Sequence, residues 1–311
     1  MQDIVAAVPS PTGEERHDIP VQLAGPLQPG AENVVLVAHD FHHGHRSAGE
    51  GGWWPAMIGP ERPLDTRRYT ILTPSHGFET PGHAPELRLS HIADAMAAVL
   101  DHLQIERLHA VIGGGSGGLA ALTFAVRHPH RTRRLLSIAS GARVTTLQSM
   151  HLAHQIAALD LAGEDPDRLE LAWRIFTVRR GSLTALEAAA GSSDVEDIDR
   201  YLHRTSRRYW EHTDPHALRR LLWAWRHFDL ATDSGMPDAS RALSRLAGIQ
   251  TLVLGIDSDA LFYPAEQAYL TQLLDGVGVS YRRFTVHSEQ GHDGWLSEPH
   301  IYGPLVTEAL A

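Results

Sequence analysis

Hydrophobic residues along this chain form two kinds of pattern, short continuous runs and longer series at helical spacing. The runs, typical of strands buried in a parallel sheet, cover residues 33–39, 69–74, 108–112, 135–139, 250–256 and, in mixed form, 280–286. Helical spacing marks the stretch that Ser90 is expected to cap, through Leu103, and the stretch from Pro264 to Leu274. The alternation predicts an α/β fold with a mostly parallel central sheet flanked by helices.

The alternation stops between residues 146 and 230. Every hydrophobic series there has helical spacing, and no run of strand character interrupts it. We therefore expect two parts, a core made of residues 1–145 and 231–311 and an inserted helical lid made of residues 146–230. The lid should lie over the carboxyl ends of the strands, where α/β proteins bind their ligands.

Composition narrows the classes of function. The chain has 311 residues, a formal net charge of -10, no cysteine and 21 histidines. The negative charge argues against nucleic acid or an anionic membrane surface as a partner, and the lack of cysteine excludes thiolate catalysis and disulfides. The first ten residues lack the basic start of a signal peptide, and the longest apolar runs are too short to cross a bilayer. A cytoplasmic location is expected.

A glycine-rich segment follows the run at residues 108–112. It reads Gly-Gly-Gly-Ser-Gly-Gly, with Ser116 as its only hydroxyl, and a helical pattern begins at Leu119. A G-x-S-x-G pentad between a strand and a helix holds a catalytic serine on a tight, strained turn with its hydroxyl exposed. Ser116 is the candidate nucleophile.

Two later segments supply partners for such a serine. Asp259 lies just after the run at residues 250–256, and His292 lies in the loop after the last predicted strand. A carboxylate orients the imidazole, and the imidazole moves a proton to and from the reacting centre. The order serine, acid, histidine along the chain is the one found in α/β hydrolases. We prefer Asp259 over Asp257 as the acid, while helix capping by Asp259 and a surface position for His292 are the alternatives.

Longer strings of residues resemble the homoserine O-acetyltransferase family of α/β hydrolases. They are Gly52-Trp53-Trp54, Ile58-Gly59-Pro60, residues 64–69, residues 101–103 and 105–108, residues 257–262 and Gly291-His292-Asp293. The resemblance implies the α/β-hydrolase fold, with Asp259 and His292 as catalytic acid and base. It also implies an oxyanion hole, built from the backbone N–H of Phe41 and that of the residue after the nucleophile, which is Gly117 if Ser116 attacks.

The chain departs from the family pattern at two places. The family reads Gly-Gly-Ser-Met-Gly-Gly at the turn, and an ungapped match puts Gly115, not Ser116, in the serine column. Either the turn has slipped by one residue, or the nucleophile is lost and Ser116 only contributes to the oxyanion region. In the lid, Ala157 falls where the family has an arginine for the homoserine carboxylate. This predicts that homoserine is not the substrate.

The loop after the first of these runs is rich in histidine. His39, His42, His43 and His45 fall within seven residues, but no further ligand accompanies them, so no metal site is expected. His42 and Trp53 are instead candidates to line the substrate site. The pairs Arg179-Arg180 and Arg207-Arg208 are expected on solvated helix faces, with contact to an anionic acceptor as the alternative.

The sequence therefore predicts an enzyme that acts on an O-acyl, and in particular an O-acetyl, ester of a small or medium metabolite. The acyl group passes through Ser116 to an alcohol or to water. The first alternative is a lyase in which the His292 and Asp259 pair removes a proton and a carboxylate leaves, with no acyl-enzyme. The second is a binding protein without catalysis. No tightly bound cofactor is expected; acetyl-CoA is a candidate co-substrate, the acyl group can be borne by a carrier or coenzyme, and a homodimer is left open.

Overall fold

A computed structural model of the protein describes residues 1–9, 16–28, 30–76, 86–191 and 194–311. Its centre is an eight-stranded sheet in the order β1-β2-β6-β3-β7-β8-β9-β10. The strands are β1 (Gln2–Pro9), β2 (Arg16–Ala24), β3 (Val34–Ala38), β6 (Thr70–Pro74), β7 (Ala110–Gly114), β8 (Arg134–Ile138), β9 (Gln250–Ile256) and β10 (Tyr281–Val286). All pairs from β6 to β10 are parallel, whereas β1 and β2 pair antiparallel at one edge. A separate two-stranded sheet joins β4 (Ile58–Gly59) to β5 (Leu64–Asp65).

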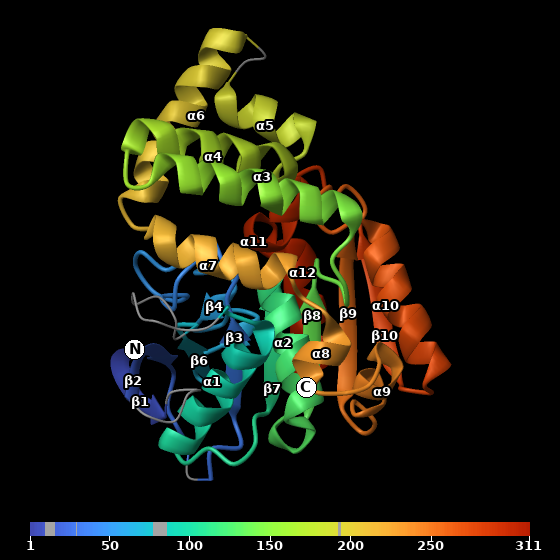
Figure 1. The fold of residues 1–311 in the computed structure, drawn as a ribbon. Helices are drawn as coiled ribbons and strands as arrows, with labels where there is room; N and C mark the ends of the chain where they lie inside the picture. Colours follow the sequence, from blue (N-terminus) through green and yellow to red (C-terminus); the bar gives the residue numbers. More distant parts are fainter. Residues whose placement is uncertain (10–15, 29, 77–85, 192–193) are drawn as a thin grey trace.

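Helices cover both faces of the sheet (Figure 1). One face packs against helices whose buried side chains belong to the larger core, and these are α1 (Leu89–His102), α2 (Ser116–Arg127), α8 (Leu230–Ser234), α9 (Ala239–Ser244) and α10 (Pro264–Gly276). The other face packs against α12 (Pro299–Leu310) and the segment around Trp54. Strands β3 and β7 are fully buried because helices or loops lie on both sides, which explains their continuous apolar runs.

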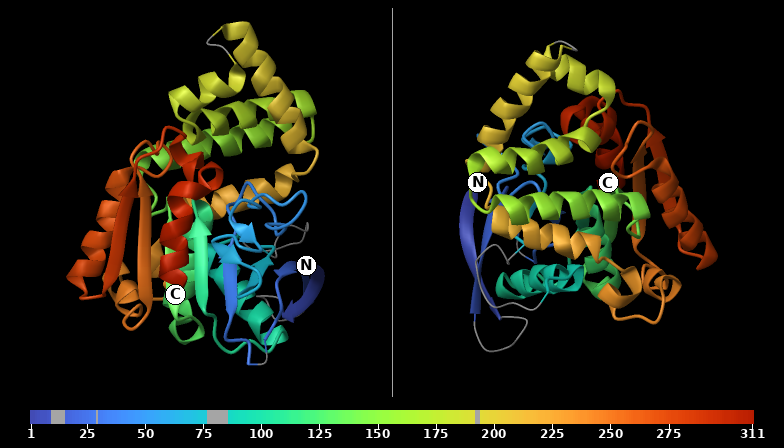
Figure 2. Two further views of the ribbon diagram at one scale, coloured as in Figure 1. Left: turned by 180° about the vertical axis from the view of Figure 1, so that it is seen from behind. Right: turned by 45° about the horizontal axis from the view of Figure 1, so that its top comes forward.

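The segment predicted as a lid is helical and lies beyond the carboxyl ends of the strands (Figures 1 and 2). Its helices are α3 (Thr146–Ala162), α4 (Pro166–Arg180), α5 (Leu183–Ala190), α6 (Val195–Trp210) and α7 (Pro215–Arg226). Four of them begin at a polar cap whose side chain accepts a backbone N–H, and these caps are Asp165, Ser182, Asp194 and Asp214. Thr145 caps α3 in the same way and forms a reciprocal pair with Gln148.

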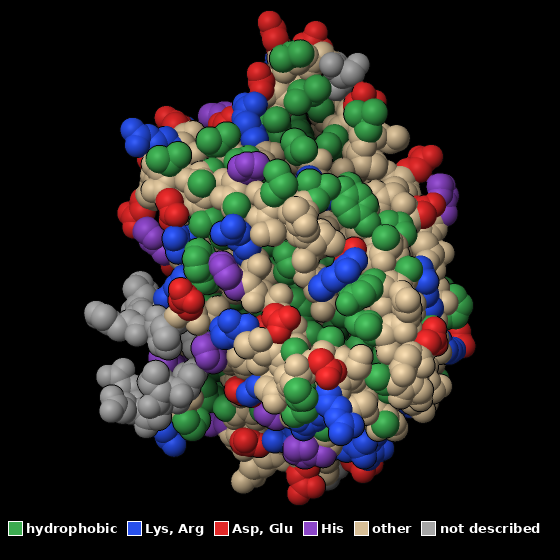
Figure 3. Space-filling view, turned by 45° about the vertical axis from the view of Figure 1, so that its right-hand side comes forward, with side chains coloured by type: hydrophobic (Ala, Val, Ile, Leu, Met, Phe, Trp, Pro, Cys, Tyr) green, Lys and Arg blue, Asp and Glu red, His purple; other side chains and the backbone are tan. Residues whose placement is uncertain are grey.

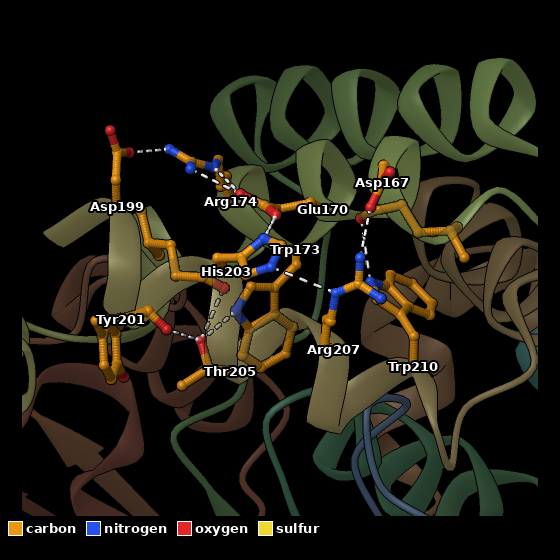
Figure 4. Close-up of polar contacts among 12 residues, drawn as sticks. Asp167, Glu170, Trp173, Arg174, Asp199, Tyr201, His203, Thr205, Arg207 and Trp210 are labelled. Carbon is orange, nitrogen blue, oxygen red and sulfur yellow. Dashed lines mark hydrogen bonds and ion pairs between the residues drawn. The ribbon is translucent and has the colours of Figure 1, made fainter. Parts of the chain in front are cut away.

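Polar contacts join α4 to α6 (Figure 4). Arg174 bonds both Glu170 on its own helix and Asp199 on α6, and the Trp173 indole donates to the hydroxyl of Thr205 at 2.9 Å. Arg207 also reaches Asp167, at 2.7 Å, so this arginine crosses between helices and is not a purely solvated side chain. The ion pairs Arg174–Asp199 and Arg207–Asp167 are exposed, so each contributes little to the stability of the contact between α4 and α6.

The structure corrects the predicted start of α1. Ser90 lies inside the helix, whose cap is Arg88. The carboxylate of Asp233 accepts the backbone N–H of Ser90 at 3.1 Å and also pairs with Arg88. The first turn is therefore capped from α8, a residue distant in the sequence, which the local pattern did not reveal.

Candidate functional site

The glycine-rich turn joins β7 to α2, and Gly115 is the residue at its apex. Gly115 has φ 57° and ψ -128°, a backbone conformation that side chains disfavour, and it immediately precedes the helix that Ser116 begins. A Cβ atom placed on Gly115 would lie 2.9 Å from His292 Nε2 and 2.6 Å from Asp40 Oδ2. Position 115 is thus where a nucleophile would face the histidine, and the chain has no side chain there.

Ser116 lies one residue further along, and its hydroxyl points elsewhere. The side chain is fully buried. Its Oγ accepts the backbone N–H of Phe41 at 2.9 Å and donates to Asp40 Oδ2, also at 2.9 Å. His292 Nε2 has no hydrogen-bond partner among the described residues, so no bond joins it to Ser116. The hydroxyl predicted as the nucleophile therefore does not face His292, and the turn adopts the ungapped register, with Gly115 at the apex.

His292 and Asp259 form a buried pair. Nδ1 of His292 lies 2.8 Å from Asp259 Oδ2, and the other carboxylate oxygen accepts the backbone N–H groups of Leu261 and Phe262. Burial alone would lower the pKa of His292, but the carboxylates of Asp259, Asp293 and Asp40 together raise it above its ordinary value. Nδ1 is thereby held as the N–H, and Nε2 faces the apex at Gly115.

Asp40, directly after β3 and His39, completes the centre. Its Oδ2 accepts both the N–H and the hydroxyl of Ser116, and its Oδ1 accepts the N–H of His42 at 3.0 Å. Burial favours the neutral carboxyl, yet the contacts with His42 and the positive charge of Arg180 hold the pKa of Asp40 well below its usual range. An ionised carboxylate therefore lies beside the apex of the turn at Gly115.

The lid contributes polar groups from two helices. Gln155 on α3 lies 3.2 Å from His42 Nε2, and the ring of His42 stacks on Phe176 with centroids 3.5 Å apart. Arg180, near the end of α4, pairs with Asp293 and lies 3.0 Å from His43 Nε2. The site is therefore enclosed by core loops below and by α3 and α4 above.

Comparison with known proteins identifies the family. A model described as the alpha/beta hydrolase fold matches residues 46–299. A homoserine O-acetyltransferase of Nocardia farcinica is 30% identical, over 93% of this chain and 86% of that protein. The chain belongs to the homoserine O-acyltransferase family of α/β hydrolases. It is an enzyme of this acyltransferase and esterase group.

Solved structures agree in fold. The homoserine O-acetyltransferase of Bacillus anthracis superposes with a TM-score of 0.88, at 20% identity, over 99% of this chain and 96% of that one. An acetylester hydrolase of Corynebacterium glutamicum gives a TM-score of 0.83, at 20% identity, over 99% and 95%. The predicted α/β-hydrolase fold is confirmed.

The backbone N–H groups next to the apex, where the oxyanion donors were predicted, have partners within the chain. The Phe41 N–H is bound to Ser116 Oγ. Because Gly115 is at the apex, the residue after it is Ser116, not Gly117, and the Ser116 N–H is bound to Asp40 at 3.3 Å. A Cβ on Gly117 would lie 2.2 Å from the carbonyl oxygen of Ala38, so this glycine serves the close packing of α2 against β3.

The histidines and tryptophans of the loop after β3 have separate environments. Trp54 is buried in the core, whereas Trp53 is half-buried and stacks on His43 with centroids 4.9 Å apart. His39 lies against His76, and His42 against Phe176. Within the ranges described, no three His, Cys, Asp or Glu residues gather as metal ligands, and no helix is long and apolar enough to cross a membrane.

The structure also corrects the interpretation of Ala157. This residue is exposed on α3, and the same helix turns His151 and Gln155 inward. Its identity therefore says nothing about a carboxylate subsite, and the relative from Nocardia is itself a homoserine O-acetyltransferase. Exclusion of homoserine has no support. Sequence reasoning missed Asp40, Gln155 and the inward position of Arg180, although Asp40 stands at the carboxyl end of a strand, where sites form.

Proposed function

We propose that this enzyme acts on an O-acyl, in particular O-acetyl, ester of a small or medium metabolite, and that His292, oriented by Asp259, moves the proton. The acyl group passes to an external acceptor without an acyl-enzyme on Ser116. The observation that carries this proposal is the geometry of the apex, where unpartnered His292 Nε2 faces Gly115 while the Ser116 hydroxyl is bound to Phe41 and Asp40. A cytoplasmic location and the absence of a tightly bound cofactor belong to the same proposal.

A variant of Ser116 tests the proposal. We expect Ser116→Ala to keep most of the acetyl-ester activity, because the change leaves His292 and Asp259 in place and frees the Phe41 N–H for a substrate oxygen. A fluorophosphonate should leave the native protein unlabelled. The assay offers acetyl-CoA and p-nitrophenyl acetate as donors, with homoserine, serine and water as acceptors. Abolished activity in Ser116→Ala, together with labelling of Ser116 in the native protein, would contradict the proposal and support an acyl-enzyme on Ser116.

Elimination is the second candidate, and a specific observation favours it. Both N–H groups that would stabilise a tetrahedral oxyanion already have partners, and one of those partners is the charged Asp40. A base that removes a proton while a carboxylate leaves depends less on such a hole for the acyl oxygen. Product analysis separates the routes, since elimination yields an alkene with free carboxylate and acyl transfer yields an alcohol or a new ester.

A homodimer through the lid is the last part of the proposal. Most of the exposed large hydrophobic side chains lie on the lid helices, among them Leu171 and Val178 on α4, and Figure 3 shows hydrophobic side chains gathered there. We expect light scattering to give the mass of two chains for the native protein. Leu171→Glu with Val178→Glu should give one, whereas Phe284→Glu on β10, the matched control, should still give two. A native mass of one chain contradicts this part.

A further inference from the structure

The junction of α4 and α5, residues 179–182, contacts the loop that carries the catalytic acid. Nη2 of Arg179 donates to the carbonyl oxygen of Ala260 and, at 3.0 Å, to the hydroxyl of Tyr263. The guanidinium also lies over the Tyr263 ring, 5.4 Å from its centroid. Ala260 directly follows Asp259, so a side chain of the lid holds the backbone next to the acid. Arg179 was expected on a solvated helix face, and these contacts correct that expectation.

The turn that begins at Asp259 sets the direction of its carboxylate. Oδ1 accepts the backbone N–H groups of Leu261 and Phe262, at 2.8 and 2.7 Å, and Oδ2 lies 2.8 Å from Nδ1 of His292. Because both oxygens have partners, the carboxylate keeps its contact with His292 only while the turn keeps its place. Arg179 bonds a carbonyl oxygen within this turn, so it helps to fix that place.

The same junction contacts the loop of the base. Arg180 pairs with Asp293, the residue after His292. Gly291, the residue before His292, has φ 67°, and a Cβ placed on it would lie 2.5 Å from the backbone nitrogen of Ser182. The Ser182 hydroxyl also donates to a carbonyl oxygen of this loop. The junction therefore lies directly against the loops of acid and base alike.

We propose that Arg179 is a positioning residue for the reaction: it holds the turn of Asp259 in register with His292, whose loop the same junction fixes through Arg180. The inference rests on the proposed function, because it requires His292 as the group that moves the proton. Arg179 acts through Asp259. A misplacement of about 1 Å in a catalytic group can cost about 10²-fold in rate, even when its cause lies far from the chemistry.

His292 is faced by charged and titratable groups from several elements. They are Asp259 after β9, Asp293 in the loop of His292 itself, Asp40 and His42 in the loop after β3, and Arg180 on α4, which pairs with Asp293. Burial lowers the pKa of His292, and the three carboxylates more than offset this. A weaker contact with Asp259 should therefore lower the pKa, whereas loss of the Arg180 charge beside Asp293 should raise it.

The first experiment measures p-nitrophenyl acetate turnover by the full-length Arg179→Gln variant. We expect kcat to fall about 10- to 100-fold with KM little changed, and the acidic limb of the pH–activity profile to move to lower pH. This ester carries no carboxylate, so an arginine that only binds a substrate anion would not affect it. Undiminished kcat, or a lower kcat with an unmoved limb, overturns the inference.

Two further variants separate positioning from stability. Arg179→Lys keeps a donor for both oxygens and should recover most of the lost kcat. Arg174→Gln is the matched control on the same helix, because Arg174 bonds only lid residues in the structure, Glu170 and Asp199. It should leave kcat and the acidic limb unchanged. Equal losses of kcat in Arg174→Gln and Arg179→Gln overturn the inference.

Arg180→Gln gives a prediction of opposite sign. With Asp293 no longer neutralised, the acidic limb should move to higher pH, whereas general loosening of the lid would move it the same way in both variants and overturn the inference. The two proposals fail separately. Undiminished activity in His292→Ala removes the proposed function, and loss in His292→Ala with none in Arg179→Gln removes only the role of Arg179.

Discussion

His292→Ala should lower kcat for acetyl-ester turnover by roughly 10²- to 10⁴-fold, the usual contribution of a positioned proton-transfer group. The reason is that Nε2 of His292 is directed at the apex, and the ring is held by Asp259 at 2.8 Å. The fold should survive, because the lost side chain can be replaced by water beneath the lid. Steady-state kinetics and a thermal melt measure both effects.

His287→Ala is the matched control for this variant. His287 forms a second histidine and aspartate pair, 2.6 Å from Asp257, but its side chain is exposed and lies away from the apex. Its removal should leave kcat unchanged. Equal loss in the two variants would contradict a specific role for His292.

Asp259→Asn should be almost as damaging, with kcat lower by about 10²- to 10⁴-fold, because the amide no longer fixes the tautomer or stabilises the imidazolium. It should also change the pH profile. The base must be neutral, so activity of the native enzyme should fall as pH drops through a pKa above the ordinary 6.5 of histidine. Loss of the Asp259 charge lowers that pKa and should move the acidic limb to lower pH.

Asp257→Asn serves as the control for the acid. Asp257 bonds His287 and the backbone N–H of Ser288 at the surface, so its neutralisation should change neither kcat nor the acidic limb. If the acidic limb of the pH–activity profile did not move in Asp259→Asn, the limb would report the titration of a group other than His292.

Strands β3, β6, β7, β8 and β9 were predictable from the sequence, because strands buried on both faces are continuously apolar. The exposed edge strand β10 showed only a mixed pattern. The antiparallel strands β1 and β2 were not predicted, although residues 4–8 of β1 form an apolar run, because β2 mixes polar and apolar residues and the pair lies at the edge of the sheet. The C-terminal helix α12 was also not predicted. Its Pro304 interrupts an otherwise helical series, although the helix continues through it.

The site was only partly predictable. The order and loop positions of Asp259 and His292 indicated the pair, and the structure brings them together, but the sequence left the apex undecided between Gly115 and Ser116. A shift of one residue within a run of glycines changes no hydrophobic pattern, and only the backbone angles of the folded turn distinguish the two registers. Asp40 was missed because its contacts with Ser116 span 76 residues.

The prediction that Ala157 lies in the substrate site was wrong for a different reason. A column match placed it in the substrate site, but a helix presents a different face every residue, and α3 directs His151 and Gln155 toward the site instead. The packing of the lid helices decides how each helix is rotated about its axis, and therefore which of its residues face the site. The sequence pattern of the lid alone does not determine this rotation.

Intact-protein mass spectrometry during turnover tests the central claim most directly. The native enzyme is mixed rapidly with p-nitrophenyl acetate, quenched in acid within milliseconds, and weighed, while released p-nitrophenol is followed for a burst. With Gly115 at the apex and the Ser116 hydroxyl held by Phe41 and Asp40, we predict an unmodified mass and no burst. An acetyl adduct that maps to Ser116 would contradict the account.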